Sequence, residues 1–292
     1  MSTPRISIVT PSFNQAPFVE HTLRSILDQN YGNLEYIVID GGSTDGSVEI
    51  ISQYAPQLAY WVSEPDDGHG NALNKGFKRS TGEIMAWLNS DDIYFPWTLQ
   101  TVAEIFASHP EVSWISSHAC AILDQKGRIV TADRKYNNKY SYLLGRHNVP
   151  QESTFWRSSL WERAGGYINE DYKLMVDGEL WSRFFAHARL YNVRCMLGGF
   201  RCWGGNRSIV DNKQVNADMR RCVATLEKSC DPATLLNLAR MRQALKYPDG
   251  IRRNIARKIM HRLAPSLHAE TAFDLLTPTG NGWLKRTTPF QV

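Results

Sequence analysis

Cysteine, long apolar runs and repeated segments are scarce or missing in this sequence. The five cysteines form no CxxC pair, and their odd number does not fit a framework of paired disulfides. No apolar run reaches the length that a bilayer-spanning helix needs, and no internal repeat stands out. The first residues lead into a predicted strand without the apolar core of a signal peptide. These absences predict a soluble protein in a reduced, cytoplasmic setting.

The sequence does contain enough apolar residues for a sizeable core. It has 292 residues, of which 42% are hydrophobic, and a formal net charge of +4. Segments of helical periodicity, such as the one in which Val19, Leu23 and Ile26 share a face, alternate with short apolar stretches. Such strands between helices indicate a mostly parallel sheet covered on both faces, with strands at residues 5–10, 36–40, 58–63 and 83–88. The predicted fold class is therefore α/β.

Acidic residues follow three of these predicted strands in succession. They are Asp40, the pair Asp66 and Asp67, and the pair Asp91 and Asp92. Parallel sheets bind ligands at the carboxyl ends of their strands. Adjacent carboxylates need a compensating positive charge, and oxygen ligands suit Mg²⁺ or Mn²⁺, which also bind substrate phosphates. The pattern predicts a metal-bound diphosphate substrate, while a solvated turn or a helix N-cap is the alternative for a single acidic pair.

Five motifs in order carry a resemblance to a known family. They are Pro-Ser-Phe-Asn at 11–14, Ile-Asp-Gly-Gly-Ser-Thr-Asp-Gly-Ser at 39–47, Ser-Glu-Pro-Asp at 63–66, Asn-Lys-Gly at 74–76 and Asn-Ser-Asp-Asp at 89–92. Together they resemble the family 2 inverting glycosyltransferases of bacterial surface-polysaccharide type. The resemblance implies a GT-A (Rossmann-like) fold. It also implies a catalytic domain over residues 1–212, with a nucleotide-sugar-binding half at 1–118 and an acceptor-side half at 119–212.

The resemblance also implies roles for donor-side residues. Thr10, Pro11 and Ser12 match the first nucleotide-binding turn, and Asp40 matches the acid beside the base and ribose. Asp91 is expected near the ribose, and Asp92 is expected to bind Mn²⁺ or Mg²⁺. The donor sugar and diphosphate are expected near Asp66, Asn74 and Lys75, whereas His69 is expected to be a surface loop residue.

Gly41 is a departure from the family pattern. Many members carry a second acid at this position, where it contacts the base. The identity of the nucleotide therefore stays open. The pair Gly41 and Gly42 permits either a close backbone approach to the nucleotide or a plain tight turn.

A second group of motifs lies downstream and resembles the acceptor side of the family. Asp177 matches the catalytic base at the start of a helix, which takes the proton of the attacking hydroxyl. A helix N-cap is the alternative role for Asp177. In the late loop, Trp203 stands where many relatives have His, and Arg201 and Arg207 are expected to contact phosphate. The other expected acceptor-side residues are Gln151, Glu152, Glu179 and Trp181.

The chain changes character after about residue 212. Residues 213–292 are predicted to form a basic helical appendage. Between residues 240 and 262 there are eight Lys or Arg residues and one acid, and apolar residues recur at spacing four. This amphipathic helix is expected either to lie on an anionic membrane surface or to pack on the catalytic domain. Nucleic acid is not an expected partner, because no recognised motif accompanies the charge.

The sequence as a whole predicts a metal-dependent inverting glycosyltransferase. Its donor would be a nucleotide-sugar carrying a hexosyl or N-acetylhexosaminyl group, and its acceptor a glycan or a lipid-linked molecule. A single displacement would form a β-linkage during polysaccharide biosynthesis at the cytosolic face of the inner membrane. One alternative is a sugar nucleotidyltransferase, which residues 11–17 disfavour because they lack a glycine-rich basic loop. The other is a catalytically inactive glycan- or nucleotide-binding module.

Overall fold

The computed structural model describes residues 3–134, 136–145, 149–206, 211–245, 273–280 and 282–288. Its first half alternates strands and helices as predicted. The elements are β1 (Ile6–Ser12), α1 (Val19–Leu27), β2 (Leu34–Asp40), α2 (Ser47–Tyr54), β3 (Tyr60–Ser63), α3 (His69–Phe77) and β4 (Ile84–Trp87). β1 pairs in parallel with both β2 and β4, and β2 pairs in parallel with β3. The carboxyl ends of these strands therefore meet at one edge of the sheet.

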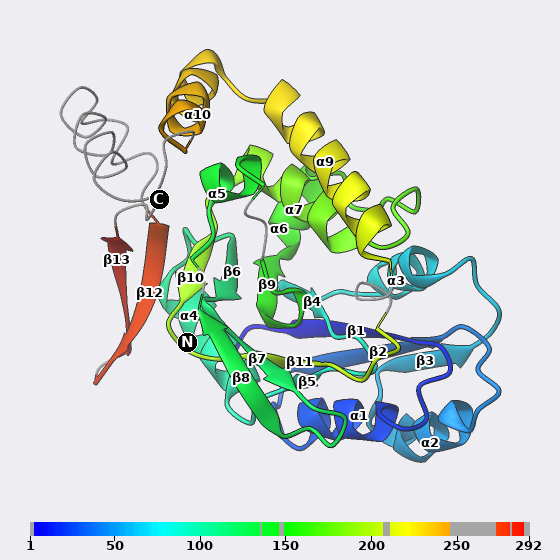
Figure 1. The fold of residues 1–292 in the computed structure, drawn as a ribbon. Helices are drawn as coiled ribbons and strands as arrows, with labels where there is room; N and C mark the ends of the chain where they lie inside the picture. Colours follow the sequence, from blue (N-terminus) through cyan, green and yellow to red (C-terminus); the bar gives the residue numbers. More distant parts are fainter. Residues whose placement is uncertain are drawn as a thin grey trace.

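The second half extends this sheet and adds a smaller one. The main sheet has nine strands in the order β13-β12-β10-β6-β9-β4-β1-β2-β3, and the second has the order β5-β11-β7-β8. Figure 1 shows α1 and α2 on one side of the main sheet and α3, α6 and α7 on the other. The elements are β5 (Ile93–Tyr94), α4 (Thr98–Ser108), β6 (Trp114–Ser117), β7 (Ala119–Leu123), β8 (Ile129–Arg134), α5 (Lys139–Leu143), β9 (Thr154–Arg157), α6 (Ser158–Arg163), α7 (Val176–His187), β10 (Tyr191–Val193) and β11 (Gly198–Arg201).

Aromatic side chains fill the core between the sheet and α7. Trp87 of β4 stacks on Trp181 of α7 with ring centroids 5.6 Å apart, and Trp156 of β9 packs edge-on against both rings. Trp181 is 2% exposed. The ring of Trp181, predicted as an acceptor-side residue, therefore lies in the core, where the apolar face of α7 directs it.

The C-terminal region is only partly helical. α9 (Asn212–Lys228) and α10 (Pro232–Leu245) follow the prediction, but β12 (Phe273–Thr279) and β13 (Gly282–Thr288) form a hairpin. β12 pairs in parallel with β10, so the hairpin completes the main sheet and corrects the prediction of an all-helical appendage. Most of the predicted basic helix, from residue 246 onward, lies outside the described residues. Within the described ranges, no helix is long and apolar enough to cross a membrane.

Gly76 allows α3 to lie directly on β1. A Cβ atom at this position would collide with the side chain of Val9, which is fully buried in β1. Helix and strand can approach this closely only without a side chain between them. The glycine of the Asn-Lys-Gly motif is therefore explained by packing.

We expect Gly76→Ala to lower the free energy of unfolding by about 1–3 kcal/mol, because overpacking forces the helix from the sheet. Gly32→Ala is the matched control, since a Cβ at Gly32 would have no heavy atom within 4 Å. Chemical denaturation of both variants measures the difference. Equal stability of the two variants would contradict the close approach.

Candidate functional site

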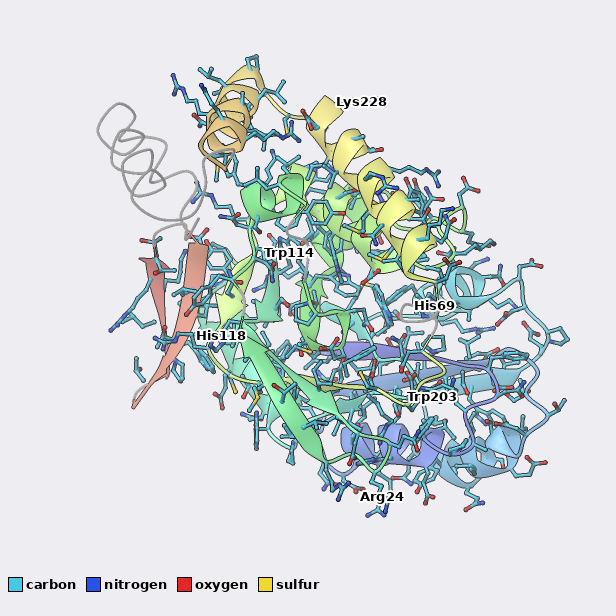
Figure 2. The ribbon with its side chains drawn as sticks, in the orientation of Figure 1. Arg24, His69, Trp114, His118, Trp203 and Lys228 are labelled. Atoms are coloured by element: carbon cyan, nitrogen blue, oxygen red, sulfur yellow. The ribbon has the colours of Figure 1, made fainter. Side chains whose placement is uncertain are left out.

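A cavity of about 410 Å³ opens at the carboxyl ends of the parallel strands. Five of the residues predicted for the site line it, namely Pro11, Ser12, Asp66, Asp91 and Trp203. Figure 2 labels Trp203 and another wall residue, His69. The other lining residues are Phe13, Gln15, Gly41, Gly68, Ala72, Asn89, Ser90, Lys173, Leu174, Phe200, Gly205 and Asn206.

Asp91 and Asp92 occupy different environments although they are adjacent. Asp91 lines the cavity, and its Oδ2 accepts hydrogen bonds from Trp203 Nε1 at 2.9 Å and Asn206 Nδ2 at 3.3 Å. Asp92 is 1% exposed, and its Oδ1 accepts the backbone N–H of Arg201 at 2.9 Å. The carboxylate that faces the cavity is therefore Asp91, whereas the sequence prediction gave the metal to Asp92.

Arg201 holds this acidic turn from behind and does not line the cavity. The residue is 1% exposed, and its Nε donates to the backbone oxygen of Asp91 at 2.7 Å. Its other nitrogens donate to the oxygen of Gln125 at 2.9 Å and to His21 Nδ1 at 2.9 Å. The guanidinium of Arg201, predicted to contact phosphate, is bound to protein groups in this structure. Arg207 lies outside the described residues.

Three acidic side chains near this turn have raised pKa values, and burial is the largest cause for each. Burial first, and then the charges of Asp91 and Glu152, raise the pKa of Asp92 well above its usual value. Burial also raises the pKa of Asp91. Burial and the charge of Asp177 raise the pKa of Glu152, which accepts a hydrogen bond from the Cys120 thiol at 2.7 Å. Such a site favours a cation, which relieves repulsion between ionised carboxylates.

The arrangement fits a cation that the protein holds only in part. The described residues contain no group of three or more His, Cys, Asp or Glu side chains placed to bind a metal. Asp91 at the wall offers one carboxylate, and the acidic surroundings favour positive charge. A Mg²⁺ or Mn²⁺ ion that completes its shell with diphosphate oxygens matches this donor set.

Ser12 and Asp66 present polar groups to the cavity. The Ser12 hydroxyl is buried and has no hydrogen-bond partner among the described residues, so a ligand would satisfy it. A Cβ at Gly41 would lie 2.9 Å from Asp66 Oδ2. Asp66 therefore fills the space that the family's second acid would need, and its Oδ1 accepts the Gly68 N–H at 2.8 Å.

The N-terminus of α3 points its first residues at the cavity. Gly68 and His69 line the wall, Gly68 has φ of 105°, and no acidic residue occurs in the first turn. The N-cap residue Gly68 has no side chain to cap the helix, and its own N–H is bound by Asp66. Helix N-termini attract anions such as phosphate through their N–H groups and dipole. His69, which the sequence placed on the surface, instead joins its Nε2 to Asn89 Oδ1 at 3.0 Å.

Four residues predicted to bind the donor have side chains that are bonded to other parts of the protein. Thr10 and Asp40 are fully buried; Thr10 bonds to the Tyr36 hydroxyl, and Asp40 accepts the N–H of Ser43 at 2.8 Å. Lys75 forms an ion pair with Glu64 at 2.8 Å. Asn74 binds the backbone of Ile168 at 2.7 Å. The motif positions are near the cavity, but these side chains turn toward protein partners.

Most of the predicted acceptor-side residues are also bonded to protein partners. Gln151 donates to the Trp87 oxygen at 2.7 Å and accepts from Asn89 at 3.1 Å, so it supports the cavity wall. Glu179 is 7% exposed and forms an ion pair with Arg183 at 2.8 Å. Asp177 lies in the first turn of α7 with part of its surface exposed. Burial of its carboxyl group raises the pKa of Asp177 to about 6.

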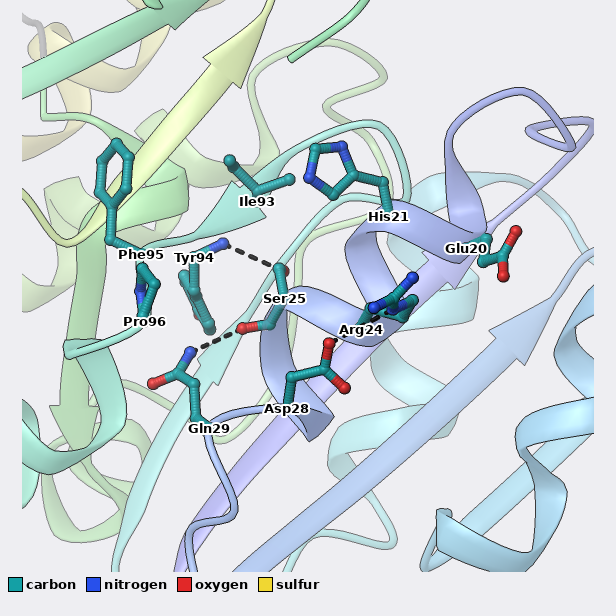
Figure 3. Close-up of a pocket in the computed structure, with 10 residues that line it drawn as sticks. All are labelled: Glu20, His21, Arg24, Ser25, Asp28, Gln29, Ile93, Tyr94, Phe95 and Pro96. Atoms are coloured by element: carbon teal, nitrogen blue, oxygen red, sulfur yellow. Dashed lines mark hydrogen bonds and ion pairs between the residues drawn. The ribbon is translucent and has the colours of Figure 1, made fainter. Parts of the chain in front are cut away.

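A second cavity, of about 560 Å³, lies between α1 and the segment after Asp92 (Figure 3). Its polar residues pair with one another: Arg24 with Asp28 at 3.3 Å, and Gln29 with the Ser25 oxygen at 2.7 Å. His21, which lines this cavity, forms a hydrogen bond with Arg201. The smaller cavity, which gathers the motif residues, is therefore the candidate active site.

Comparison with known proteins identifies the family. A model described as glycosyl transferase family 2 matches residues 7–164. The chain belongs to this family. It is 33% identical over 226 residues to an uncharacterised glycosyltransferase of Mycobacterium tuberculosis strain H37Rv, covering 75% of this chain and 83% of the relative. A PGL/p-HBAD biosynthesis glycosyltransferase of Mycobacterium bovis strain BCG is 28% identical over 222 residues, covering 73% and 83%.

Solved structures share the fold of this family 2 glycosyltransferase. The crystal structure of Staphylococcus aureus TarS residues 1-349 with UDP-GlcNAc has a TM-score of 0.62 at 16% identity, covering 91% of this chain and 83% of that one. The mannosyltransferase PcManGT of Pyrobaculum calidifontis, solved with GDP-Man and Mn²⁺, has a TM-score of 0.52 at 18% identity, covering 91% and 87%. The predicted GT-A architecture is confirmed.

The raised pKa of Asp177 predicts a pH-dependent effect on stability. The folded protein binds this proton more tightly than the unfolded chain, so the stabilisation is complete at low pH and is lost as pH rises through about 6. Asp177→Asn has no carboxyl group to ionise, so it does not lose this stabilisation. We expect its melting temperature to exceed that of wild type at about pH 8 but not at about pH 4. Thermal unfolding measures this, with exposed Asp171→Asn as control for lost charge. A melting difference that does not change with pH would contradict the burial of Asp177.

Proposed function

We propose that this protein is an inverting glycosyltransferase that moves a sugar from a nucleoside-diphosphate donor to a hydroxyl group of a glycan or lipid-linked acceptor. One observation carries the proposal: Asp91, the Ser12 hydroxyl and the N-terminus of α3 converge on one cavity. These groups suit a cation, a nucleoside and an anionic diphosphate, respectively. Family membership supports the same chemistry.

The nucleoside would lie against Pro11, Ser12 and Gly41, within reach of Asp66. The Oδ2 atom of Asp66 is suited to accept an N–H of the base, because Oδ1 already binds Gly68. Phe13, which is 60% exposed beside the cavity, offers an aromatic face for stacking. Two structural neighbours were solved with UDP-GlcNAc and with GDP-Man, which supports a hexosyl or N-acetylhexosaminyl donor.

The diphosphate would lie between the N-terminus of α3 and Asp91. Lys173 on the opposite loop adds a positive charge to the wall. A bound Mn²⁺ or Mg²⁺ would stabilise the negative charge that develops on the leaving diphosphate. Asp91 would be the protein ligand that faces the ion, and Asp92 would lie beneath it, anchored to the Arg201 backbone.

Asp177 would act as the general base. The acceptor hydroxyl attacks the anomeric carbon as the bond to the diphosphate breaks, and its proton passes to a carboxylate oxygen of Asp177. A single displacement inverts the anomeric centre, so an α-linked donor yields a β-glycosidic bond. A pKa of about 6 keeps Asp177 ionised at neutral pH yet basic enough to accept a proton. Lys173 and Leu174 on the cavity wall lie just before Asp177 in the chain, which supports an acceptor path along this loop.

Polysaccharide assembly at the cytosolic face of a membrane stays a prediction from the sequence, since the basic segment that would bind lipid lies largely outside the described residues. Family membership argues against a nucleotidyltransferase. An inactive binding module would bind nucleotide-sugars without consuming them.

Replacement of the base tests the mechanism. Asp177→Asn keeps the shape of the side chain but cannot take the proton, and we expect turnover to fall by about 10²–10⁴ with nucleotide affinity nearly unchanged. Release of nucleoside diphosphate from a panel of UDP- and GDP-sugars, together with calorimetric binding of UDP or GDP with Mn²⁺, measures both quantities. The control is Glu179→Gln, which is expected to retain turnover. A loss of turnover in Glu179→Gln but not in Asp177→Asn would make Glu179 the general base.

The two aspartates are predicted to differ in their effect on the metal. Asp91→Asn should raise the Mn²⁺ concentration that half-saturates nucleotide binding by roughly tenfold or more, because it removes a charge-assisted ligand. Asp92→Asn should have the smaller effect, since Asp92 is buried behind Asp91. Mn²⁺ titrations of nucleotide binding compare them. A larger increase in that Mn²⁺ concentration for Asp92→Asn than for Asp91→Asn would make Asp92 the direct ligand.

A further inference from the structure

The side chain of Asn74 ties together two segments that are distant in sequence. Its Oδ1 accepts the N–H of Ile168 at 2.7 Å, and its Nδ2 donates to the Ile168 oxygen at 2.9 Å and to Glu170 Oε1 at 2.7 Å. Asn74 is on α3, and Ile168 and Glu170 are in the loop between α6 and α7. The amide thus uses both donor hydrogens and one acceptor site within the protein.

The loop fits closely on the first turns of α3. A Cβ at Gly70 would lie 3.4 Å from Glu170 Cγ and 3.5 Å from Ile168 Cγ2. Asn71 Nδ2 lies 3.4 Å from Glu170 Oε2, and Ile168 is 1% exposed. Polar and apolar contacts therefore hold residues 168–170 in one register on the helix.

The loop is held at its other end by Arg183 of α7. Arg183 donates to the backbone oxygens of Ala164 and Tyr167, the latter at 2.8 Å, and its guanidinium lies 4.4 Å from the centre of the Tyr167 ring. One loop is consequently attached to α7, which carries Asp177, and to α3, whose N-terminus lies at the donor cavity. Between the attachment on α3 and Asp177, Lys173 and Leu174 line the cavity.

We propose that Asn74 is a positioning residue that sets the acceptor side of the site against the donor side. It does so by holding residues 168–170 on α3, which places the following residues and Asp177 relative to the bound diphosphate. The inference rests on the proposed function and assigns Asn74 no contact with the donor. Loss of the contacts should lower turnover about 10–100-fold while leaving nucleotide affinity within about twofold, because a shift near 1 Å in the reacting groups has effects of this size.

A paired substitution tests this arrangement. Asn74→Asp keeps the acceptor for the Ile168 N–H, loses both donors and places a carboxylate against Glu170. Adding Glu170→Gln to that variant supplies an amide that can donate to the carboxylate introduced at position 74. We expect the double variant to recover about tenfold or more of the turnover that Asn74→Asp loses. Glu170→Gln alone is the matched control and should stay near wild type.

Turnover is measured as nucleoside diphosphate release from the preferred UDP- or GDP-sugar with Mn²⁺, water serving as acceptor, and affinity by calorimetry with UDP or GDP. Hydrogen exchange of residues 168–174 supplies a readout independent of activity. It should be faster in Asn74→Asp and slower again in the double variant.

The outcomes are distinct. Nucleotide affinity that falls tenfold in Asn74→Asp and is not recovered in the double variant would make Asn74 a donor contact and overturn the inference. The inference would also be overturned if the wild type is active and Asn74→Asp changes neither its turnover nor the hydrogen exchange of residues 168–174. If Asn74→Asp fails to fold, a folded double variant with wild-type turnover supports the inference, and a folded double variant with turnover lost overturns it. A wild type that neither binds nor consumes any nucleotide-sugar overturns the proposed function itself.

Discussion

Negative charge buried beside the end of β4 is the constraint on which the site depends. Burial raises the pKa of Asp91, Asp92 and Glu152, and the charges of Asp91 and Glu152 raise that of Asp92 further. Arg201 is the buried cation beside Asp91 and Asp92. Its guanidinium binds backbone oxygens and His21 rather than a carboxylate, so it braces the turn without neutralising all of the acids. Like charges that are buried together disfavour full ionisation of the acids, and a positive charge placed among them would relieve that repulsion. The proposed cation and the shape of the turn would thus depend on the same buried carboxylates.

Sequence patterns predicted the place of the site better than the direction of its side chains. Apolar runs with acidic exits were enough to locate the carboxyl edge of the sheet, and the motif residues Ser12, Asp66 and Asp91 line the cavity there. The patterns could not show which of the adjacent residues Asp91 and Asp92 faces the cavity, because the Arg201 backbone, far along the chain, binds the other. The partners of Asn74 are equally remote in sequence, so its motif position indicated proximity to the donor rather than contact with it.

The final strands escaped prediction for a different reason. β12 contains Pro278, which is unfavourable in a central strand, and β13 carries Lys285 and Arg286 with most of its surface exposed. The local sequence of each segment is therefore not typical of a strand. The preceding basic stretch at residues 240–262 favoured a helix. Their pairing is decided by the open edge of β10, a tertiary feature that no local pattern contains.

The parallel pairing of β10 with β12 also constrains the order of events during synthesis. Chains emerge from the ribosome N-terminus first, and domains fold as their segments become available. The edge of β10 must therefore stay unpaired until residues 273–279, which form β12, have been made. An unpaired edge is a template for association with other chains, so a nascent or truncated molecule is at greater risk of aggregation than the finished one. The β12–β13 hairpin, although distant from the cavity in the chain, is the covalently attached cover of that edge.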